Sequence, residues 1–170
     1  MNYIKITRYD TANGIGIRDV LWVAGCEHHC EGCHNFTTWD KDQGKPITEE
    51  VIEGIVQDLQ LSYFHGLTLS GGDPLATYNR KHSTQIAKTI KERCPDKTIW
   101  CYTGYLWEEL IDQEILQYLD VLVDGKFVLS ERNLMLPYCG SNNQRVIDVS
   151  QSMEHNKIIL FNPSLFTDWD

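Results

Sequence analysis

The sequence predicts an α/β fold, more specifically a partial (incomplete) βα barrel with mostly parallel strands, within a single domain of residues 1–170. Two observations predict it. Short apolar runs that end at glycine or polar residues alternate with amphipathic stretches, a pattern that favours right-handed crossovers and a parallel sheet. The chain has 170 residues, whereas a complete eight-unit barrel typically needs about 250. A barrel made from this chain would therefore be open on one side.

The first half of the chain supplies two predicted strands and one helix. Residues 17–24 (IRDVLWVA) are rich in branched and aromatic side chains and stop at Gly25, as a buried strand does before a turn. From Thr48, TEEVIEGIVQDLQL places its apolar residues on one stripe, with Thr48 as the N-cap and two acids in the first turn. Residues 67–70 predict a second strand, which ends at Gly-Gly-Asp-Pro because proline cannot continue the pairing.

The second half repeats this alternation. A helix is predicted from about residue 80 to 93, a strand over 98–102, a helix over 107–118 and a strand over 120–123. Residues 145–149 predict one further strand. Because ligands of parallel sheets bind beyond the carboxyl ends of the strands, the informative residues are expected at those ends. The polar and aromatic tail, residues 151–170, is not placed by its pattern, and its role is unknown.

Charge and hydropathy exclude several classes of function. Fifteen Lys and Arg against twenty-four Asp and Glu give a net charge of -9, which disfavours nucleic-acid binding and attraction to anionic membranes. No apolar run approaches the roughly 18 residues of a membrane helix, and the amino-terminal residues are too polar for a signal peptide. The protein is therefore expected to be cytoplasmic, with no nucleic-acid partner and no membrane.

Three of the six cysteines fall within eight residues. Cys26, Cys30 and Cys33 have the spacing C-x3-C-x2-C directly after the first predicted strand. In a reducing compartment such thiols are available for metals, and iron-sulfur clusters are normally held by cysteine. A 4Fe-4S cluster held by only three thiolates would leave one iron open to a small ligand. The other cysteines are scattered and are expected to be structural thiols: Cys94, Cys101 and Cys139.

The triplet alone also permits a zinc site. Three thiols together with one imidazole make a tetrahedral Cys3His site, and His28, His29 and His34 all lie within reach in the sequence. The cysteine spacing does not decide between zinc and a cluster, so the choice depends on the rest of the chain.

The cysteine triplet, followed by Gly-Gly-Asp-Pro at the end of the next strand, resembles the radical S-adenosylmethionine superfamily. Further segments, which occur in order over about residues 1–145, narrow the resemblance to the activating proteins of anaerobic ribonucleoside-triphosphate reductase, a family of glycyl-radical-enzyme activases. Two features depart from the pattern: the segment after Arg145 extends beyond the family, and Gly32 replaces an aromatic that many superfamily members have. The segments are NGIGIR (13–18), GC (25–26), GCHN (32–35), TW (38–39), LSGGDPL (69–75), WCYTGY (100–105), VDGKF (123–127) and GSNNQR (140–145).

This resemblance implies a mechanism. Cys26, Cys30 and Cys33 would hold one 4Fe-4S cluster per chain, and S-adenosylmethionine would bind its open iron. One electron would then give methionine and a 5'-deoxyadenosyl radical, which abstracts hydrogen from a glycine of the partner reductase. The cofactors perform this chemistry, so no side chain is assigned as catalytic. The family also implies an electron donor such as reduced flavodoxin; because the net charge is -9, a docking patch for another acidic protein would have to be local.

The resemblance also implies where S-adenosylmethionine would be contacted. The glycines would let backbone approach the ligand, and the Asp73 carboxylate or neighbouring carbonyls would accept from its ammonium group. Turn formation explains the strand-end residues equally well. His34 is interpreted as an exposed or packing residue rather than an iron ligand. The expected contacts are Gly32, Cys33, His34, Gly71, Gly72, Asp73, Thr103 and Gly104.

Two rival functions remain open at this point. A radical S-adenosylmethionine enzyme that acts on a small molecule would keep the cysteines and the Gly-Gly-Asp-Pro segment, but it would not explain the later motifs. A zinc-binding module would need only the Cys3His set and no cofactor pocket. Bound metal separates these classes, because about four irons per chain indicate the enzyme and one zinc indicates the module.

Overall fold

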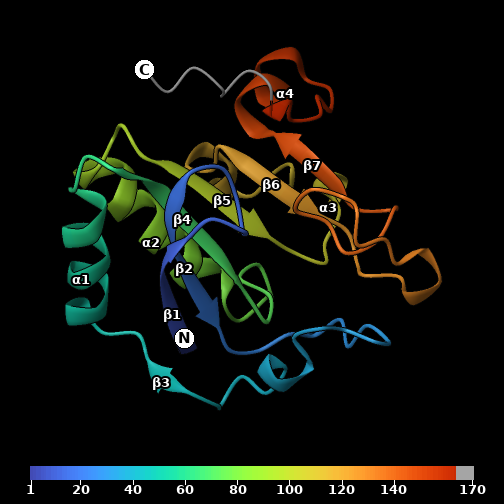
Figure 1. Ribbon diagram of the computed structural model, residues 1–170, viewed down its shortest axis with the longest axis horizontal. Coiled ribbons are helices and arrows are strands. Elements are labelled where there is room, and N and C mark those ends of the chain that lie inside the picture. The colour runs from blue at the N-terminus through green and yellow to red at the C-terminus, as the bar shows by residue number, and fades with distance from the viewer. Residues whose placement is uncertain (164–170) are drawn as a thin grey trace.

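The computed structural model describes residues 1–163, which form an α/β fold around one seven-stranded sheet (Figure 1). The sheet order is β3-β1-β2-β4-β5-β6-β7. The four central strands are parallel, whereas β1, β3 and β7 pair antiparallel with their neighbours. The α/β prediction is confirmed with an open, mixed sheet, and its curvature into a partial barrel stays a prediction. The strands are β1 (Asn2–Asp10), β2 (Ile17–Val23), β3 (Lys45–Pro46), β4 (Phe64–Gly71), β5 (Thr98–Tyr102), β6 (Val121–Asp124) and β7 (Arg145–Asp148).

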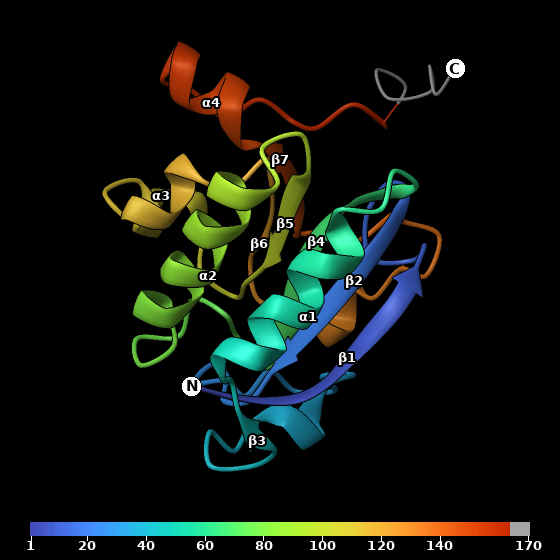
Figure 2. The same cartoon turned by 90° about the vertical axis from the view of Figure 1, so that its left-hand side faces the viewer.

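Helices cover one face of this sheet and enclose the main core (Figure 2). Helix α1 begins as predicted, because the Thr48 hydroxyl accepts a hydrogen bond from the Val51 amide. It buries Ile55 and Leu59 against the sheet, and α2 buries Ile86 and its neighbours. The helices are α1 (Glu49–Leu59), α2 (Arg80–Arg93), α3 (Trp107–Leu110) and α4 (Val149–His155), with 3-10 turns η1 (Phe36–Thr38), η2 (Glu114–Gln117) and η3 (Leu129–Glu131).

Two elements differ from the sequence prediction. The helix predicted over 107–118 is split into α3 and η2, because the Gln113 amide donates to the Leu110 carbonyl at 2.8 Å and closes a tight turn between them. The amino-terminal strand β1 was not predicted. All of its residues are half-buried or exposed, and its sequence lacks the apolar run that is typical of a core strand.

The carboxyl-terminal tail has a defined place up to residue 163. After α4, the Phe161 amide donates to the Val146 carbonyl and the Asp148 amide donates to the Ile159 carbonyl, at 2.8 and 2.9 Å. The Phe161 ring packs edge-on against Trp100, with ring centroids 5.1 Å apart. The tail thus runs antiparallel beside β7. Residues 164–170 of the predicted tail lie outside the described residues.

Arg18, the last residue of the NGIGIR segment, ties three strands together from within the core. Its guanidinium donates to the Thr68 hydroxyl and to the carbonyls of Leu67 and Thr98, all at 2.8 to 2.9 Å. It also lies over the Trp100 ring. Burial lowers the pKa of Arg18 to about 9. The segment therefore has a structural role in joining β2, β4 and β5.

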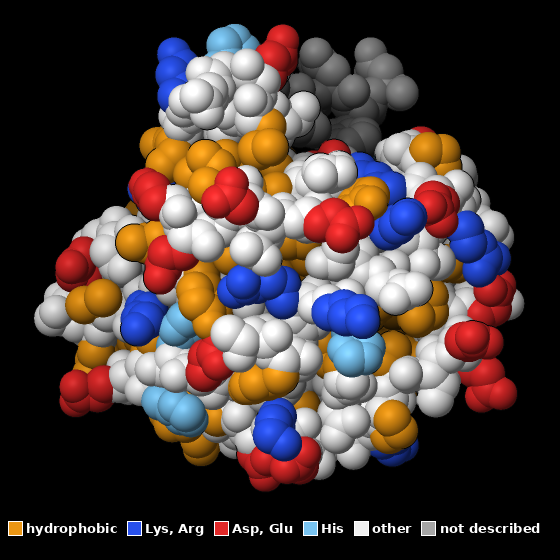
Figure 3. Space-filling model, turned by 180° about the vertical axis from the view of Figure 1, so that it is seen from behind, with side chains coloured by type: hydrophobic (Ala, Val, Ile, Leu, Met, Phe, Trp, Pro, Cys, Tyr) orange, Lys and Arg blue, Asp and Glu red, His pale blue; other side chains and the backbone are white. Residues whose placement is uncertain are grey.

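Side chains of both charges are spread over the face seen from behind (Figure 3). Within residues 1–163, no helix combines the length and apolar content that a membrane span requires.

Asp19 on β2 is a fully buried carboxylate, with the Arg8 guanidinium 3.9 Å away. Burial raises its pKa to about 6, whereas an aspartate in an unfolded chain titrates near about 3.9. The folded chain therefore holds this proton more tightly, so stability falls as the pH rises from about 4 to about 6. We expect Asp19→Asn to raise the free energy of unfolding at pH 8 by about 2 kcal/mol.

Urea unfolding at pH 8 and at pH 4 checks this expectation. The gain from Asp19→Asn should shrink at pH 4, where the wild-type carboxyl is protonated in the fold. Asp42→Asn is the matched control, because Asp42 is exposed and pairs only with Lys41. An equal effect of Asp19→Asn at both pH values would contradict the explanation by buried charge.

Candidate functional site

The cysteine loop is held against the carboxyl end of β2 by backbone hydrogen bonds. The Gly25 amide donates to the Thr38 carbonyl at 2.7 Å, and the Cys26 amide donates to the Trp39 carbonyl at 3.0 Å. Within the loop, the Cys33 amide donates to the Cys30 carbonyl at 3.1 Å. Gly32 has φ +70°, which glycine adopts without strain. This turn brings Cys30 and Cys33 to the same side of the loop.

One pocket gathers the residues predicted for the site. It lies at the carboxyl ends of β4, β5 and β6, as expected for a parallel sheet. The thiols of Cys26, Cys30 and Cys33 line it. Of the residues expected to contact the ligand, all but Gly32 line it too. Further lining residues, which were not among the expected ligand contacts although six of them lie in the family segments and His28 was a candidate zinc ligand, are His28, Asn35, Ser70, Tyr102, Gly125, Phe127 and Gln144.

Asp73 is the centre of a buried hydrogen-bond network that builds this pocket. Its Oδ1 accepts from the Leu75 amide at 2.7 Å, and its Oδ2 accepts from the Gly104 amide at 3.0 Å. The Thr103 hydroxyl lies within 2.9 to 3.0 Å of both oxygens, and His28 Nε2 lies 2.7 Å from Oδ2. The Asp73 side chain is 1 % exposed. Its oxygens are therefore used to join the cysteine loop to the ends of β4 and β5.

Two glycines permit these loops to come so close. A Cβ on Gly72 would lie 2.3 Å from the Gly25 carbonyl oxygen, and a Cβ on Gly104 would lie 2.3 Å from the His28 ring. No side chain fits at either position without displacing the cysteine loop. The glycines at the strand ends are thus required by loop packing, besides lining the pocket.

Asn79 was missed by sequence reasoning and supports the same loops. It stands at the N-cap of α2, but its side chain does not cap that helix. Instead, Asn79 Nδ2 donates to the Ala24 carbonyl at 2.9 Å and to the Asp73 carbonyl at 3.0 Å. It is 2 % exposed. No local spacing signals these contacts, because Ala24 is 55 positions away in the chain.

The outer side of the cysteine loop is fastened by Glu27. Its carboxylate accepts from the Thr77 amide at 2.9 Å, from the Thr77 hydroxyl and from the Tyr105 hydroxyl. Burial raises the pKa of Glu27, but the hydrogen bonds outweigh burial and the net change is downward. The Tyr105 ring meets the His28 ring edge-on at 4.6 Å. The two residues that follow Cys26 are thus both anchored, Glu27 to Thr77 and Tyr105 and His28 to Asp73.

The three thiols are a donor set that suits an iron-sulfur cluster. Burial raises the pKa of Cys26 to about 11 and also raises the pKa of Cys30. Metal-free thiols of this kind are protonated at neutral pH and release protons when they become ligands. Among residues 1–163, no three His, Cys, Asp or Glu side chains are grouped around the position of a single metal ion.

The histidines of the alternative zinc site are placed differently from one another. His28 is bound to Asp73, and the His29 ring packs edge-on against Trp39 at 4.8 Å. His34 is exposed and lines the pocket. Of the three histidines, His34 therefore has the side chain best placed to act as the fourth ligand of a zinc site.

Residues of the VDGKF and GSNNQR segments hold the rim of the pocket in place through hydrogen bonds. The buried Asp124 carboxylate accepts from the Trp107 amide at 2.8 Å and from the Arg145 guanidinium. Gln144 donates to the Gly125 carbonyl and accepts from the Gly140 amide, both at 2.9 Å. Asp124 therefore joins β6 to α3 and β7, while Gln144 holds the Gly140–Arg145 segment at the pocket.

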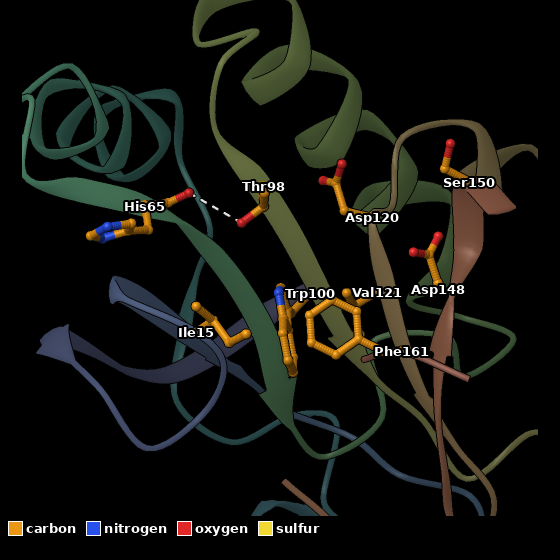
Figure 4. Close-up of a pocket in the computed structure, with 9 residues that line it drawn as sticks. All are labelled: Ile15, His65, Thr98, Trp100, Asp120, Val121, Asp148, Ser150 and Phe161. Atoms are coloured by element: carbon orange, nitrogen blue, oxygen red, sulfur yellow. Dashed lines mark hydrogen bonds between the residues drawn. The ribbon is translucent and has the colours of Figure 1, made fainter. Parts of the chain in front are cut away.

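A second cavity, of about 140 Å³, lies at the opposite end of the sheet (Figure 4). It is lined by Trp100 and Phe161 and by residues at the amino ends of the parallel strands. Its acids already have partners: Asp120 accepts from Lys91 at 2.7 Å, and Asp148 caps α4 through the Gln151 amide at 2.9 Å. This cavity carries none of the predicted site residues.

The chain is similar to several known proteins along most of its length. The family described as a 4Fe-4S single cluster domain matches residues 12–147. The chain is 43% identical to the anaerobic ribonucleoside-triphosphate reductase-activating protein of Enterobacteria phage T4 over 148 residues, 86% of this chain and 93% of that protein. The protein of the same name in Vibrio cholerae serotype O1 is 43% identical, over 85% of this chain and 96% of its own length. The Pasteurella multocida protein is 40% identical over 157 residues, 89% and 99% respectively.

Proposed function

Since this chain belongs to the family of anaerobic ribonucleoside-triphosphate reductase-activating proteins, which carry a 4Fe-4S single cluster domain, we propose that it generates a glycyl radical on that reductase. It would do so as a radical S-adenosylmethionine enzyme with one 4Fe-4S cluster per chain. When bound, the cofactors supply the chemistry: one electron splits S-adenosylmethionine into methionine and a 5'-deoxyadenosyl radical, which takes a hydrogen atom from a glycine of the reductase.

The observation that carries this proposal is the meeting of three thiols with the Gly-Gly-Asp-Pro segment in one pocket. Cys26, Cys30 and Cys33 would ligate the cluster. Backbone groups at Gly71 and Gly72 line the same pocket and would receive the amino acid part of S-adenosylmethionine. Asp73 would act mainly by positioning, since both its oxygens accept hydrogen bonds from the protein.

The remaining site residues are assigned by where they lie. Thr103 and Gly104, at the end of β5, would form the wall beside the adenosine while holding Asp73. Gly32 would act through the turn that separates Cys30 from Cys33. His34 is exposed at the pocket and would contact the ligand rather than iron.

The proposal includes partners and a compartment. The reductase is the protein substrate, and a one-electron donor such as reduced flavodoxin supplies the electron. Both act in the cytoplasm, where thiols stay reduced. No membrane or nucleic acid takes part, in keeping with a net charge of -9.

An anaerobic assay tests the proposal. The chain is reconstituted with iron and sulfide, reduced with dithionite and mixed with S-adenosylmethionine and the reductase. We expect about four irons per chain, formation of 5'-deoxyadenosine, and a glycyl radical signal in the electron paramagnetic resonance spectrum of the reductase. Omitting S-adenosylmethionine is the control for radicals that arise without cleavage.

Two outcomes would replace this function. One zinc per chain and no product would indicate a Cys3His zinc module. Formation of 5'-deoxyadenosine without any radical on the reductase, even at high reductase concentration, would indicate a radical S-adenosylmethionine enzyme with a small-molecule substrate.

A further inference from the structure

Positive charge in this acidic chain is concentrated on one helix. Helix α2 carries five of the fifteen Lys and Arg and one of the twenty-four Asp and Glu. Two of its cations are neutralised by ion pairs, Lys91 with Asp120 at 2.7 Å and Arg93 with Glu53 at 2.5 Å. Three cations of the helix have no ion pair among the described residues: Arg80, Lys81 and Lys88.

These three cations line one side of a groove between α2 and η2. The groove has a volume of about 560 Å³ and is open to solvent, whereas the cavity at the far end of the sheet has a volume of about 140 Å³. Glu114 is the one acid among its lining residues. The groove lining thus carries three cations and one acid, a net positive charge.

Figure 3 views the face that α2 helps to form. Lys and Arg side chains lie in the middle of this face with Asp and Glu side chains beside them, and side chains of both charges reach its margins. The attraction for a partner of negative charge therefore comes from the groove itself, whose lining has three cations and one acid.

The inner end of the groove contacts the cysteine loop. Thr77 lines the groove and donates through its amide to Glu27, the residue that follows Cys26. Arg80 lies over the Tyr105 ring, 5.1 Å from its centroid, and this ring packs against His28. The groove and the thiol pocket nevertheless share no lining residue. The groove thus reaches the back of the cysteine loop without using the pocket itself.

We propose that this groove is the docking surface for the acidic protein that delivers the electron. The inference rests on the proposed function, which requires one electron per cleavage. A donor seated on Arg80, Lys81 and Lys88 would reach the site from behind Cys26, past Glu27 and Tyr105. The pocket would remain free for S-adenosylmethionine and the reductase.

The test compares a protein donor with a small reductant. Lys81→Glu and Lys88→Glu are combined, and 5'-deoxyadenosine formation is followed with reduced flavodoxin or with dithionite. At low salt we expect the flavodoxin-driven rate to fall by at least about tenfold, while the dithionite-driven rate stays at the wild-type value. Added salt should slow the wild-type reaction with flavodoxin and leave the variant almost unaffected.

A matched double variant controls for net charge. Lys45→Glu combined with Lys157→Glu changes the charge equally, at exposed positions outside the groove, and should keep the flavodoxin-driven rate. Binding of oxidised flavodoxin, measured by flavin fluorescence, should weaken only in the groove variant. An unchanged flavodoxin rate, or an equal loss with both reductants, would overturn the docking site. Absence of cleavage by the wild type with dithionite and reductase would instead remove the proposed function.

Discussion

Replacing Cys30 by alanine is expected to abolish cluster binding and S-adenosylmethionine cleavage while leaving the chain folded. Cys30 is half-exposed at the pocket and belongs to neither hydrophobic core cluster. Loss of one of three thiolates leaves the cluster without an anchor, so iron should fall from about four per chain to well under one. Because loss of an outer-shell partner alone costs about 10–100-fold, we expect 5'-deoxyadenosine formation to drop by more than about 100-fold.

Cys139→Ala is the matched control for this change. Cys139 is also half-buried, but it packs beside the Trp100 cluster and does not line the thiol pocket. Its removal should leave both iron content and product unchanged. If Cys30→Ala retained wild-type iron, or if Cys139→Ala lost it, the assignment of Cys26, Cys30 and Cys33 as the ligands would be wrong.

Asp73→Ala is expected to have the largest effect of any change outside the cysteines. It removes the acceptor for Leu75, Thr103, Gly104 and His28 at once, in a position that water does not reach. Buried donors left without a partner are costly, and breaking a buried pair of this kind costs about 3–5 kcal/mol. The midpoint of urea unfolding should fall accordingly, and the reconstituted chain should lose iron faster than wild type.

A surface aspartate provides the comparison. Asp42→Ala removes an exposed carboxylate that pairs only with Lys41, so its urea midpoint and rate of iron loss should match those of the wild type. His28→Gln probes one arm of the network and should loosen the cysteine loop with a smaller loss of stability. A wild-type urea midpoint for Asp73→Ala would show that Asp73 does not hold these loops together.

The strands and helices that the sequence predicted well are those whose pattern is local. Residues 17–24, 80–93 and 98–102 correspond to β2, α2 and β5 because their apolar spacing and end signals lie within each segment. β1 was missed because a strand with one solvent-facing side near the edge of the sheet needs few apolar residues. The split between α3 and η2 follows from the turn that the Gln113 amide and the Leu110 carbonyl close, which helical periodicity alone does not reveal.

The residues of the site, too, were predicted where their signal is local in the sequence. The positions of the cysteine triplet and the Gly-Gly-Asp-Pro segment could be read from the sequence, because each directly follows a predicted strand. The partners of Asp73 could not, since His28 is 45 positions before it and Thr103 is 30 positions after it. The contacts of Asn79 could not be predicted either, because its side chain donates hydrogen bonds to the loop carbonyls instead of capping its own helix. Such contacts depend on how the strand ends meet in three dimensions.

The run of the tail beside β7 has a consequence for self-association. The last strand of an open sheet presents unpaired amides and carbonyls, which invite pairing with another chain and hence aggregation. Residues 159–161 occupy that position on β7, and Phe161 anchors them against Trp100. At the opposite margin, β3 is only two residues long and ends in Pro46, which has no amide hydrogen to offer. The tail thus shields the β7 edge against the growth of a continuous intermolecular sheet, whereas β3 covers only Asn2 and Tyr3 at the β1 edge.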